Sequence, residues 1–396
     1  MATSNWMAVQ LMLLRFAVQK NSSYAKKSRR IGKVDTSKSG KGRSYWQPSR
    51  CQTRSMPLPL KLNYAPMEAQ PAVELPAGAD WQYEPKWDGF RCLAFRNRKQ
   101  VDLISKSAKP LTRYFPELVE SLSKLRAESF VLDGEIVIPF EGGLSFDHLL
   151  MRIHPAASRV QKLSRETPGT FIVFDLLVDE QGESLVDKPL RDRREHLEEF
   201  AKRFLKSDPM IRLSPVTHEL AVARKWFHMG VALDGVVAKR SDLPYQSGKR
   251  TGMQKIKKQR TADCVVGGFR YLEKKREVGS LLLGLYDRSH KLDHVGFTSS
   301  IHEEDRKALT KRLEKIMQEP GFTGKAPGGL SRWSTKRSTE WHPLKPKLVV
   351  EVQFDHFTGG RFRHGTKFLR WRPDKSPRAC TIDQVKRENR SALQLL

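Results

Sequence analysis

Two apolar segments that contain acidic residues constrain the fold of this chain more than any other feature. Residues 131–138 and 171–178 are runs of branched and aromatic side chains typical of buried strands, and each carries carboxylates at or near its ends. Buried strands rarely hold acids without a reason, because burial strips a carboxylate of its hydration. The two segments therefore predict a buried sheet, and their carboxylates are candidate functional groups.

The segment from Trp81 to about Gln259 alternates strand and helix patterns. Runs of β-branched and aromatic residues are broken by turn residues, and helical patterns occupy 114–125 and 191–205. Strands mixed with helices in this way favour an α+β domain, which we expect to occupy residues 56–258.

After Gln259 the pattern changes to short strands with one helix. The strands are predicted at 264–269, 280–286, 294–297 and 348–354, and the helix at 303–318. This pattern predicts a small, basic β-barrel of the oligonucleotide-binding (OB) type over residues 259–396, with a generic β-domain as the alternative.

The charge of the chain indicates a polyanionic partner. Lys and Arg number 72 against 44 Asp and Glu, a formal net charge of +28, while a hydrophobic content of 38% still permits ordinary cores. A nucleic acid is the natural partner for such a surface, and a merely solvated basic surface is the alternative. Charge by itself names no reaction.

Residues 1–55 carry a large share of this charge. They hold twelve basic residues against the single acid Asp35, and they are too poor in apolar residues to form a core. We expect a disordered extension that serves as a DNA-binding tail or as a transit peptide. An upstream start, with Met56 as the true beginning, is a third interpretation.

Cysteine spacing and hydropathy argue against several classes of protein. The apolar stretch from Trp6 to Val18 is too short to span a bilayer and is interrupted by Arg15. We expect a soluble, cytoplasmic protein that does not bind membranes, with organellar targeting by residues 1–55 as the open alternative. The cysteines lie too far apart for a close-spaced zinc motif or a disulfide framework, at Cys51, Cys92, Cys264 and Cys380.

Lys86 is the candidate nucleophile. Asp88 follows it two positions later, and Arg91 lies just beyond. A lysine amine that attacks phosphorus must be neutral, so its pKa has to be lowered by burial or by nearby cations. Arg91, Lys255 and Lys257 would supply that positive field if the fold brings them together. The alternative is a solvated surface lysine.

The motifs around Lys86 and downstream resemble those of the covalent nucleotidyltransferases, which include DNA ligases, RNA ligases and mRNA capping enzymes. Each short motif is weak evidence, whereas several in the same order are hard to obtain by chance. The resemblance implies a nucleotidyltransferase (adenylation) domain followed by the OB-type barrel. The matching segments are 86–91, 105–106, 133–135, 171–175, 234–239, 255–257 and 372–375.

Within that family, the C-terminal half is similar to the small bacterial ATP-dependent DNA ligases of the ligase C type, which are associated with end joining and base-excision repair. The similarity lies in 260–269, 279–286, 361–364 and 368–375. It implies an enzyme that seals nicks or breaks in duplex DNA through lysyl-AMP and DNA-adenylate intermediates, with ATP as the co-substrate.

The resemblance also implies roles at the nucleotide. Glu84 would accept a hydrogen bond from the adenine amino group, and Phe174 would stack on the ring, which would select ATP over GTP. Without the resemblance, a surface acid and a core Phe are the favoured interpretations. The cations expected at the ribose and phosphates are Arg91, Lys106, Arg250, Lys255 and Lys257.

Two carboxylates are candidate ligands for Mg²⁺ or Mn²⁺. Glu135 and Asp234 would supply the hard oxygen atoms that these ions prefer, and Asp88 is expected to assist a later step. Turns next to strands are the structural alternative for both metal candidates.

Three residues near the C-terminus complete the expected catalytic set. The resemblance places Arg372, Asp374 and Lys375 against the pyrophosphate in the first step, after which the barrel rotates away. Duplex DNA would be bound through its backbone by basic loops such as 361–364. We expect a monomer that end-joining or repair proteins recruit to breaks.

Three positions depart from the family pattern. The family generally has Glu in place of Asp234, Arg in place of Lys106, and an aromatic residue where Met253 or Gln254 stands. The departures at Asp234 and Lys106 motivate one alternative, a non-catalytic nucleic-acid-binding protein with a decayed site. The shared lysine chemistry leaves a second, an RNA ligase or capping-type nucleotidyltransferase.

Overall fold

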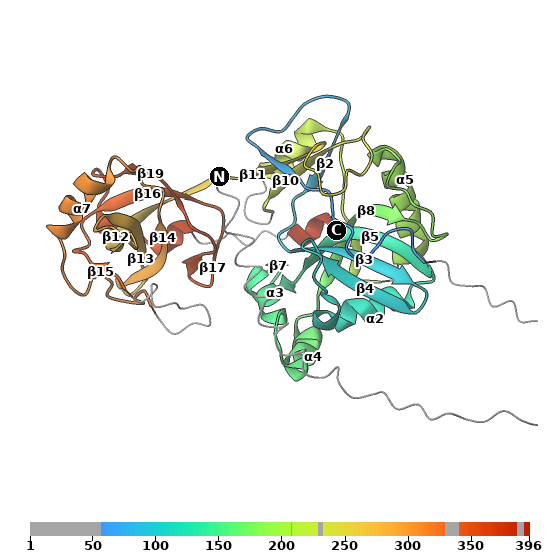
Figure 1. The fold of residues 1–396 in the computed structure, drawn as a ribbon, viewed down its shortest axis with the longest axis horizontal. Coiled ribbons are helices and arrows are strands. Elements are labelled where there is room, and N and C mark those ends of the chain that lie inside the picture. The colour runs from blue at the N-terminus through green and yellow to red at the C-terminus, as the bar shows by residue number, and fades with distance from the viewer. Residues whose placement is uncertain (1–56, 207, 229–232, 329–339, 386–391) are drawn as a thin grey trace, which may run out of the picture.

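The computed structural model describes residues 57–206, 208–228, 233–328, 340–385 and 392–396. Within these ranges the chain forms a larger N-terminal unit of helices and sheets and a smaller β-rich unit. They are joined through β11 (Met253–Lys257) and β12 (Arg260–Tyr271) (Figure 1). The extension predicted at 1–55 lies outside the described residues. No helix in the described part is long and apolar enough to cross a membrane.

A five-stranded sheet forms the centre of the N-terminal unit. Its order is β4 (Gln100–Ser105), β3 (Phe90–Asn97), β5 (Ser129–Val137), β8 (Thr170–Val178) and β9 (Ile211–Leu213). β8 is buried along its whole length, as its branched and aromatic side chains favour. The two predicted acid-bearing strands are confirmed as β5 and β8, which pair antiparallel. One core joins the sheet to α2 (Pro116–Lys124), α4 (Ala157–Glu166) and α5 (Leu190–Phe200).

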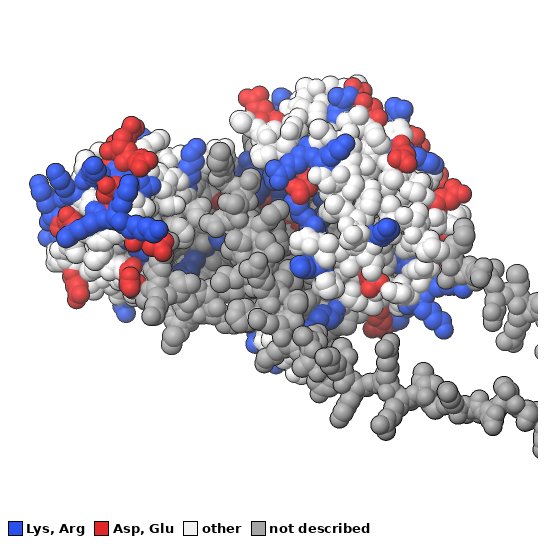
Figure 2. Space-filling view, viewed as in Figure 1, with Lys and Arg blue, Asp and Glu red and all other residues white. Residues whose placement is uncertain are grey.

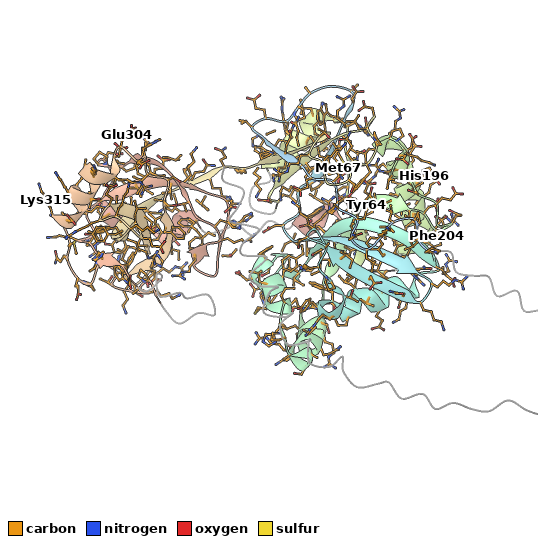
Figure 3. The ribbon with its side chains drawn as sticks, viewed as in Figure 1. Tyr64, Met67, His196, Phe204, Glu304 and Lys315 are labelled. Atoms are coloured by element: carbon orange, nitrogen blue, oxygen red, sulfur yellow. The ribbon has the colours of Figure 1, made fainter. Side chains whose placement is uncertain are left out.

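A four-stranded sheet packs against the first one. Its order is β1 (Gln70–Ala72), β11, β10 (Gly235–Arg240) and β2 (Trp81–Pro85). Ile172 of the first sheet shares a buried cluster with Tyr83 and Val236 of the second, and α6 (Leu220–His228) adds Trp226 to it. Met67 and Tyr64, which precede β1, lie toward the middle of this unit (Figure 3). The α+β class is thus confirmed.

Shorter elements complete the N-terminal unit. They are η2 (Thr112–Tyr114), β6 (Pro139–Phe140), β7 (Gly143–Leu144), α3 (Phe146–Arg152) and the π-helical segment η3 (Ala201–Leu205). The helix predicted at 191–205 is therefore α5 followed by a π-helical turn. The helix predicted at 114–125 starts only at Pro116, because proline suits the first helical position.

The smaller unit is a β-barrel. Its sheet runs β14 (Leu292–Thr298), β13 (Val278–Tyr286), β12, β16 (Val349–Phe354) and β19 (Lys367–Trp371), with β15 (His342–Pro343) beside β12. A bridge from Thr298 to Thr366 brings β14 to the start of β19, and α7 (Arg306–Glu314) lies between β14 and β16 in the chain. This arrangement of five strands, with β15 beside them, is consistent with the predicted OB-type barrel. β17 (Phe357–Thr358) and β18 (Arg361–Phe362) form a separate hairpin.

α7 is shorter than the helix predicted at 303–318. The Gln318 N–H donates to the Pro343 carbonyl at 3.1 Å, and Met317 forms a bridge with Leu344. These tertiary backbone bonds replace the helical ones, which local propensity does not anticipate. Glu304 and Lys315, near the two ends of α7, lie at the outer margin of the barrel (Figure 3).

The two units differ in surface charge and are joined a second time near the C-terminus. Lys and Arg side chains gather on the visible face of the barrel, whereas the visible face of the N-terminal unit is largely uncharged with scattered charges of both signs (Figure 2). Leu395 and Leu396 lie outside the barrel and, like Leu144, pack against the buried cluster of the N-terminal unit that includes Trp87. Short 3₁₀ turns precede and include this end, at η5 (Pro377–Ala379), η6 (Ile382–Val385) and η7 (Ala392–Leu395).

Candidate active site

Lys86 lies directly after β2, where the backbone is held from both sides. Its N–H donates to the Gly235 carbonyl at 3.0 Å, and its carbonyl accepts from the Asp234 N–H at 3.0 Å. Gly235 has a φ of +140°, and a Cβ there would lie 2.0 Å from the Ile256 carbonyl oxygen. Only glycine allows this turn to approach β11 so closely, so the backbone fixes Lys86 beside Asp234.

Carboxylates surround the Lys86 amine. The Lys86 Nζ forms an ion pair with Asp234, and Lys257 on β11 lies 3.1 Å from the same carboxylate. Glu135 on β5 accepts a hydrogen bond of 3.1 Å from the Gly89 N–H. A Cβ on Gly89 would stand 2.2 Å from the Ile136 carbonyl oxygen, so the residues after Lys86 lie directly on β5. The predicted nucleophile and both predicted metal ligands are thus brought together.

The protonation of Lys86 differs from the prediction. Burial alone would lower the pKa of Lys86, but Asp234, followed by Glu135 and Asp88, outweighs burial and raises it. The expectation of a lowered pKa is therefore wrong for this arrangement, because the nearest charges are acidic rather than basic. The pKa of Lys255 is the one that is lowered, by burial and then by Lys86 and Lys257.

The two predicted metal ligands differ in their surroundings. Burial, with Asp88 adding to it, raises the pKa of Glu135 to about 7 against the opposing effect of Lys86 and Arg91. A divalent cation would supply the positive charge that this carboxylate lacks, so Glu135 fits such an ion.

Asp234 fits a metal ion less well in this arrangement. Burial would raise its pKa, but Lys86, His356 and Lys257 hold the pKa well below its usual value. The His356 Nε2 lies 2.7 Å from Asp234 Oδ1, while the lysines contact Oδ2. An ion at Asp234 would have to displace these partners. Among the described residues, no group of three or more His, Cys, Asp or Glu is arranged to hold a metal.

The predicted base-binding residues also lie together. Phe174 on β8 is buried, and the Arg91 guanidinium lies 4.3 Å from its ring centroid. Arg91 forms a two-pronged pair with Asp133 at 2.5 and 2.6 Å, and Tyr245 donates to the same carboxylate at 2.6 Å. Glu84 on β2 is 2% exposed. The structure therefore brings Glu84, Phe174 and Arg91 into one region, and it adds Asp133 and Tyr245 as partners of Arg91, which the sequence did not indicate.

Two of the predicted phosphate-binding cations share an acid. Lys106, directly after β4, and Arg250 each lie 3.1 Å from Glu68. The structure thus brings Lys106 and Arg250 together, although they are far apart in the sequence. Glu68 was missed because it stands just outside every recognised motif and no local pattern distinguishes it.

The barrel reaches the Lys86 region through the segment around its β17–β18 hairpin. Arg363 forms a two-pronged pair with Asp88 at 2.8 and 2.9 Å, and its guanidinium lies 3.8 Å from the Phe146 ring centroid. Arg363 was predicted to contact DNA, but here it is largely buried against the N-terminal unit. The predicted DNA-binding residues beside it also have protein partners, since Arg361 contacts His294 and His364 contacts Asp355, each at 2.7 Å.

Arg372, Asp374 and Lys375 are not brought to Lys86. Arg372 donates to Asp263 on β12 at 2.9 Å and to Asp374 at 2.8 Å, and Lys375 lies 3.5 Å from Asp263. These partners all belong to the barrel. The barrel therefore presents the region of its β17–β18 hairpin, rather than these three residues, to the Lys86 region.

Comparison with known proteins identifies the family. The family model described as "ATP dependent DNA ligase domain" matches residues 66–257, and that described as "ATP dependent DNA ligase C terminal region" matches residues 274–375. "DNA ligase C2" of Mycolicibacterium smegmatis is 41% identical over 348 residues, covering 83% of this chain and 96% of that protein. "DNA ligase C" of Mycobacterium tuberculosis is 39% identical over 348 residues, covering 84% of this chain and 96% of that protein.

A solved structure agrees in fold. The structure titled "Pmar-Lig_PreS3" has a TM-score of 0.52 and 15% sequence identity, and the match covers 74% of this chain and 63% of that chain. At this identity the likeness concerns the fold alone. The two family matches and the relatives aligned over nearly their whole length show that this chain belongs to the small bacterial ATP-dependent DNA ligases.

Proposed function

We propose that Lys86 is the residue through which this DNA ligase carries AMP. Its Nζ attacks the α-phosphorus of ATP, an N–P bond forms, and the bond to the departing pyrophosphate breaks. AMP then passes to the 5′-phosphate of a nick, and attack by the 3′-hydroxyl releases AMP and joins the strands. The observation that carries this proposal is the position of the Lys86 amine among Asp234, Glu135 and Lys257.

The Lys86 amine must lose its extra proton before it attacks. In the described arrangement Asp234 favours the charged form, so the amine becomes reactive once that contact is weakened. Glu135 is the residue best suited to hold a divalent cation, and Asp234 would be a second ligand only if its present partners left. Such a cation would neutralise charge on the phosphates.

The phosphates and ribose are assigned to the cations that surround this region. Lys255 and Lys257 lie on β11 beside Lys86, while Lys106 and Arg250 lie together at Glu68. Fixed positive charges at these positions stabilise the transferring phosphoryl group without reorganisation during the reaction. Arg91 is assigned to the ribose because it lies over the Phe174 ring.

Adenylation requires a different position of the barrel. We assign Arg372, Asp374 and Lys375 to the pyrophosphate, yet in the described arrangement they pair within the barrel while Arg363 holds Asp88. The described position therefore corresponds to the later steps, and the Arg363–Asp88 pair must break for the first one. We accordingly assign Asp88 to the steps after adenylation, in which its pair with Arg363 holds the barrel in the described position.

Double-strand break repair is the proposed setting. A relative named "Multifunctional non-homologous end joining DNA repair protein LigD" from Mycobacterium tuberculosis is 32% identical over 323 residues, covering 80% of this chain and 39% of that protein. The basic barrel surface supports binding through the DNA backbone, and affinity should fall steeply with salt (Figure 2). We propose a monomer with residues 56–258 as its adenylation domain and 259–396 as its DNA-binding barrel, recruited by end-joining proteins.

Adenylation followed by nick sealing tests the proposal. Wild type and Lys86→Ala are incubated with ATP or GTP labelled on the α-phosphate, and then with nicked DNA or RNA duplexes. We expect labelling by ATP and sealing of DNA in wild type, and neither in the variant. Labelling by GTP alone would favour a capping-type enzyme, sealing of RNA alone an RNA ligase, and no labelling with magnesium or manganese a non-catalytic protein. Labelling of Lys86→Ala would place the nucleophile elsewhere.

A further inference from the structure

Lys239 is a buried cation to which the proposed reaction assigns no role. It lies on β10 opposite Gln82 of β2, and the residue is only 4% exposed. Its Nζ lies 2.8 Å from each carboxylate oxygen of Glu84, and the Gln82 amide donates to Glu84 Oε1 at 2.8 Å. The two neighbouring strands thus build a buried group of three polar side chains, in which Gln82 and Lys239 both contact the Glu84 carboxylate.

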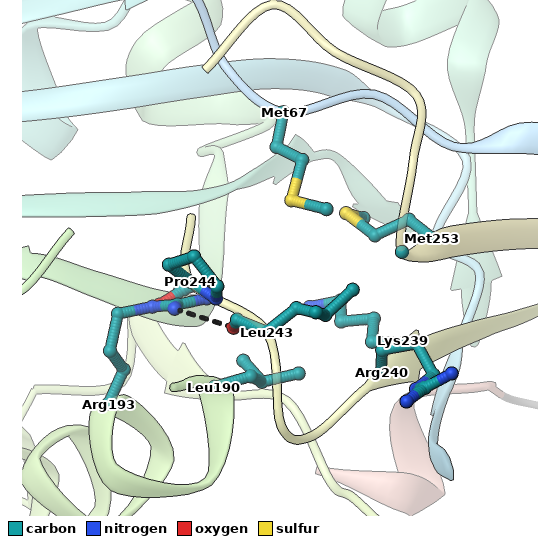
Figure 4. Close-up of a pocket in the computed structure, with 10 residues that line it drawn as sticks. Met67, Leu190, Arg193, Lys239, Arg240, Leu243, Pro244 and Met253 are labelled. Atoms are coloured by element: carbon teal, nitrogen blue, oxygen red, sulfur yellow. Dashed lines mark hydrogen bonds and ion pairs between the residues drawn. The ribbon is translucent and has the colours of Figure 1, made fainter. Parts of the chain in front are cut away.

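This group faces the ring expected to stack on the base. The Lys239 Nζ lies 4.5 Å from the centroid of Phe174, which belongs to the facing sheet. The Lys239 side chain also lines a small pocket with Met67 and Met253 (Figure 4). The Lys239–Glu84 pair therefore lies among buried side chains, with the buried Asp175 and Arg193 lining the same pocket, and little water remains to screen the pair.

The contacts leave Glu84 with a limited capacity for further bonds. An ionised carboxylate has about four acceptor sites and no donor. Gln82 and the two contacts of Lys239 occupy three of them in the described part of the chain. One further hydrogen-bond donor can be accommodated, whereas an approaching lone pair would meet a fixed negative charge.

We propose that Lys239 determines base specificity by holding Glu84 as an ionised, oriented acceptor, so that the site takes 6-aminopurine nucleotides and rejects 6-oxopurine nucleotides. The inference rests on the proposed placement of the base between Glu84 and Phe174. Lys239 acts through Glu84 and is a positioning residue. Without its ammonium, a buried Glu84 takes up a proton or turns away, and either change ends the discrimination.

Inosine triphosphate is the probe, because its base carries an oxo group and a ring N–H where adenine has an amino group and a ring acceptor. Wild type and Lys239→Met are adenylated or inosinylated with each nucleotide, and kcat/KM is measured for formation of the covalent protein. Methionine preserves the length and apolar stem of lysine. We expect wild type to prefer ATP, and the preference to fall roughly 10- to 100-fold in the variant, the factor for one hydrogen bond to a charged group.

Two further variants separate specificity from folding. Arg240→Met changes the next residue of β10. The Arg240 guanidinium pairs with Asp242 at a distance of 2.7 Å and not with Glu84, so this variant should leave the preference unchanged. The double variant Glu84→Gln with Lys239→Met removes both buried charges, so no unpaired ion remains to unfold the protein. It should also lose the preference. If thermal unfolding shows that Lys239→Met does not fold, retention of the preference by the double variant is the result that overturns the inference.

The outcomes separate this inference from the proposed function. If wild type forms no covalent adduct with ATP, the proposed function fails. If wild type reacts with ATP but does not prefer it to inosine triphosphate, only the inference fails. Retention of the wild-type preference by folded Lys239→Met, or by the double variant, also overturns it.

Discussion

Replacing Arg363 by Met should release the barrel from the N-terminal unit. Arg363 and Asp88 form two hydrogen bonds of 2.8 and 2.9 Å, with side chains 10% and 19% exposed, and the guanidinium also lies over Phe146. Truncating one partner of a buried, hydrogen-bonded charge pair costs about 2 to 5 kcal/mol. Because this pair lies where the two units meet, we take the lower part, about 2 to 3 kcal/mol.

That free energy shifts the ratio of docked to undocked barrel by roughly 30- to 150-fold, since about 1.4 kcal/mol corresponds to a factor of ten. Undocking favours the movement that brings Arg372, Asp374 and Lys375 toward Lys86. We therefore expect the variant to retain or gain rate in adenylation by ATP and to lose rate in sealing a nick that already carries AMP on its 5′-phosphate.

The measurement combines single-turnover rates of the two steps with the distance between fluorophores placed on the two units. Arg370→Met is the matched control, because Arg370 pairs with Glu351 at 2.6 Å entirely within the barrel. An unchanged distance distribution in Arg363→Met, or equal effects of the two variants on sealing, would refute the reasoning.

Two other predictions concern Gly89 in the loop after Lys86 and the Glu135 carboxylate that accepts a hydrogen bond from it. Gly89→Ala would place a Cβ 2.2 Å from the Ile136 carbonyl oxygen. We therefore expect a lower unfolding temperature and at least a roughly tenfold slower adenylation. A wild-type unfolding temperature together with a wild-type adenylation rate would contradict the close approach. Because the pKa of Glu135 is raised from 4.5 to about 7, the folded state binds the proton more tightly than the unfolded state. The associated stability is present below pH 4.5 and is lost as pH rises to about 7. Glu135→Gln should flatten the pH dependence of thermal unfolding across this window, and a parallel curve would exclude that assignment.

Local patterns in the sequence were sufficient to predict the architecture. The strands β5 and β8 were predicted because strands buried on both faces leave a nearly continuous run of branched and aromatic residues in the sequence. The order of short motifs around Lys86, Glu135 and Lys255 pointed to the covalent nucleotidyltransferases, and the C-terminal segments pointed to the DNA ligases among them. Each of these segments is contiguous and can be recognised without knowing its neighbours in space. The C-terminal end of α7 could not be predicted, because the chain after it bonds to β15 and its flank instead of continuing the helix.

The electrostatics of the site were decided only by the tertiary structure. The amino-acid sequence by itself determined that Lys86 is the candidate nucleophile and that cations and acids accompany it. Whether acids or cations lie nearest, and hence the direction of its pKa, depends on the Asp234 contact made across β2 and β10. The Arg363–Asp88 and Lys239–Glu84 ion pairs were also decided by the tertiary structure, because the partners are far apart in the sequence. Charge interactions depend on distance and on burial, and neither quantity is recorded in the order of residues along the chain.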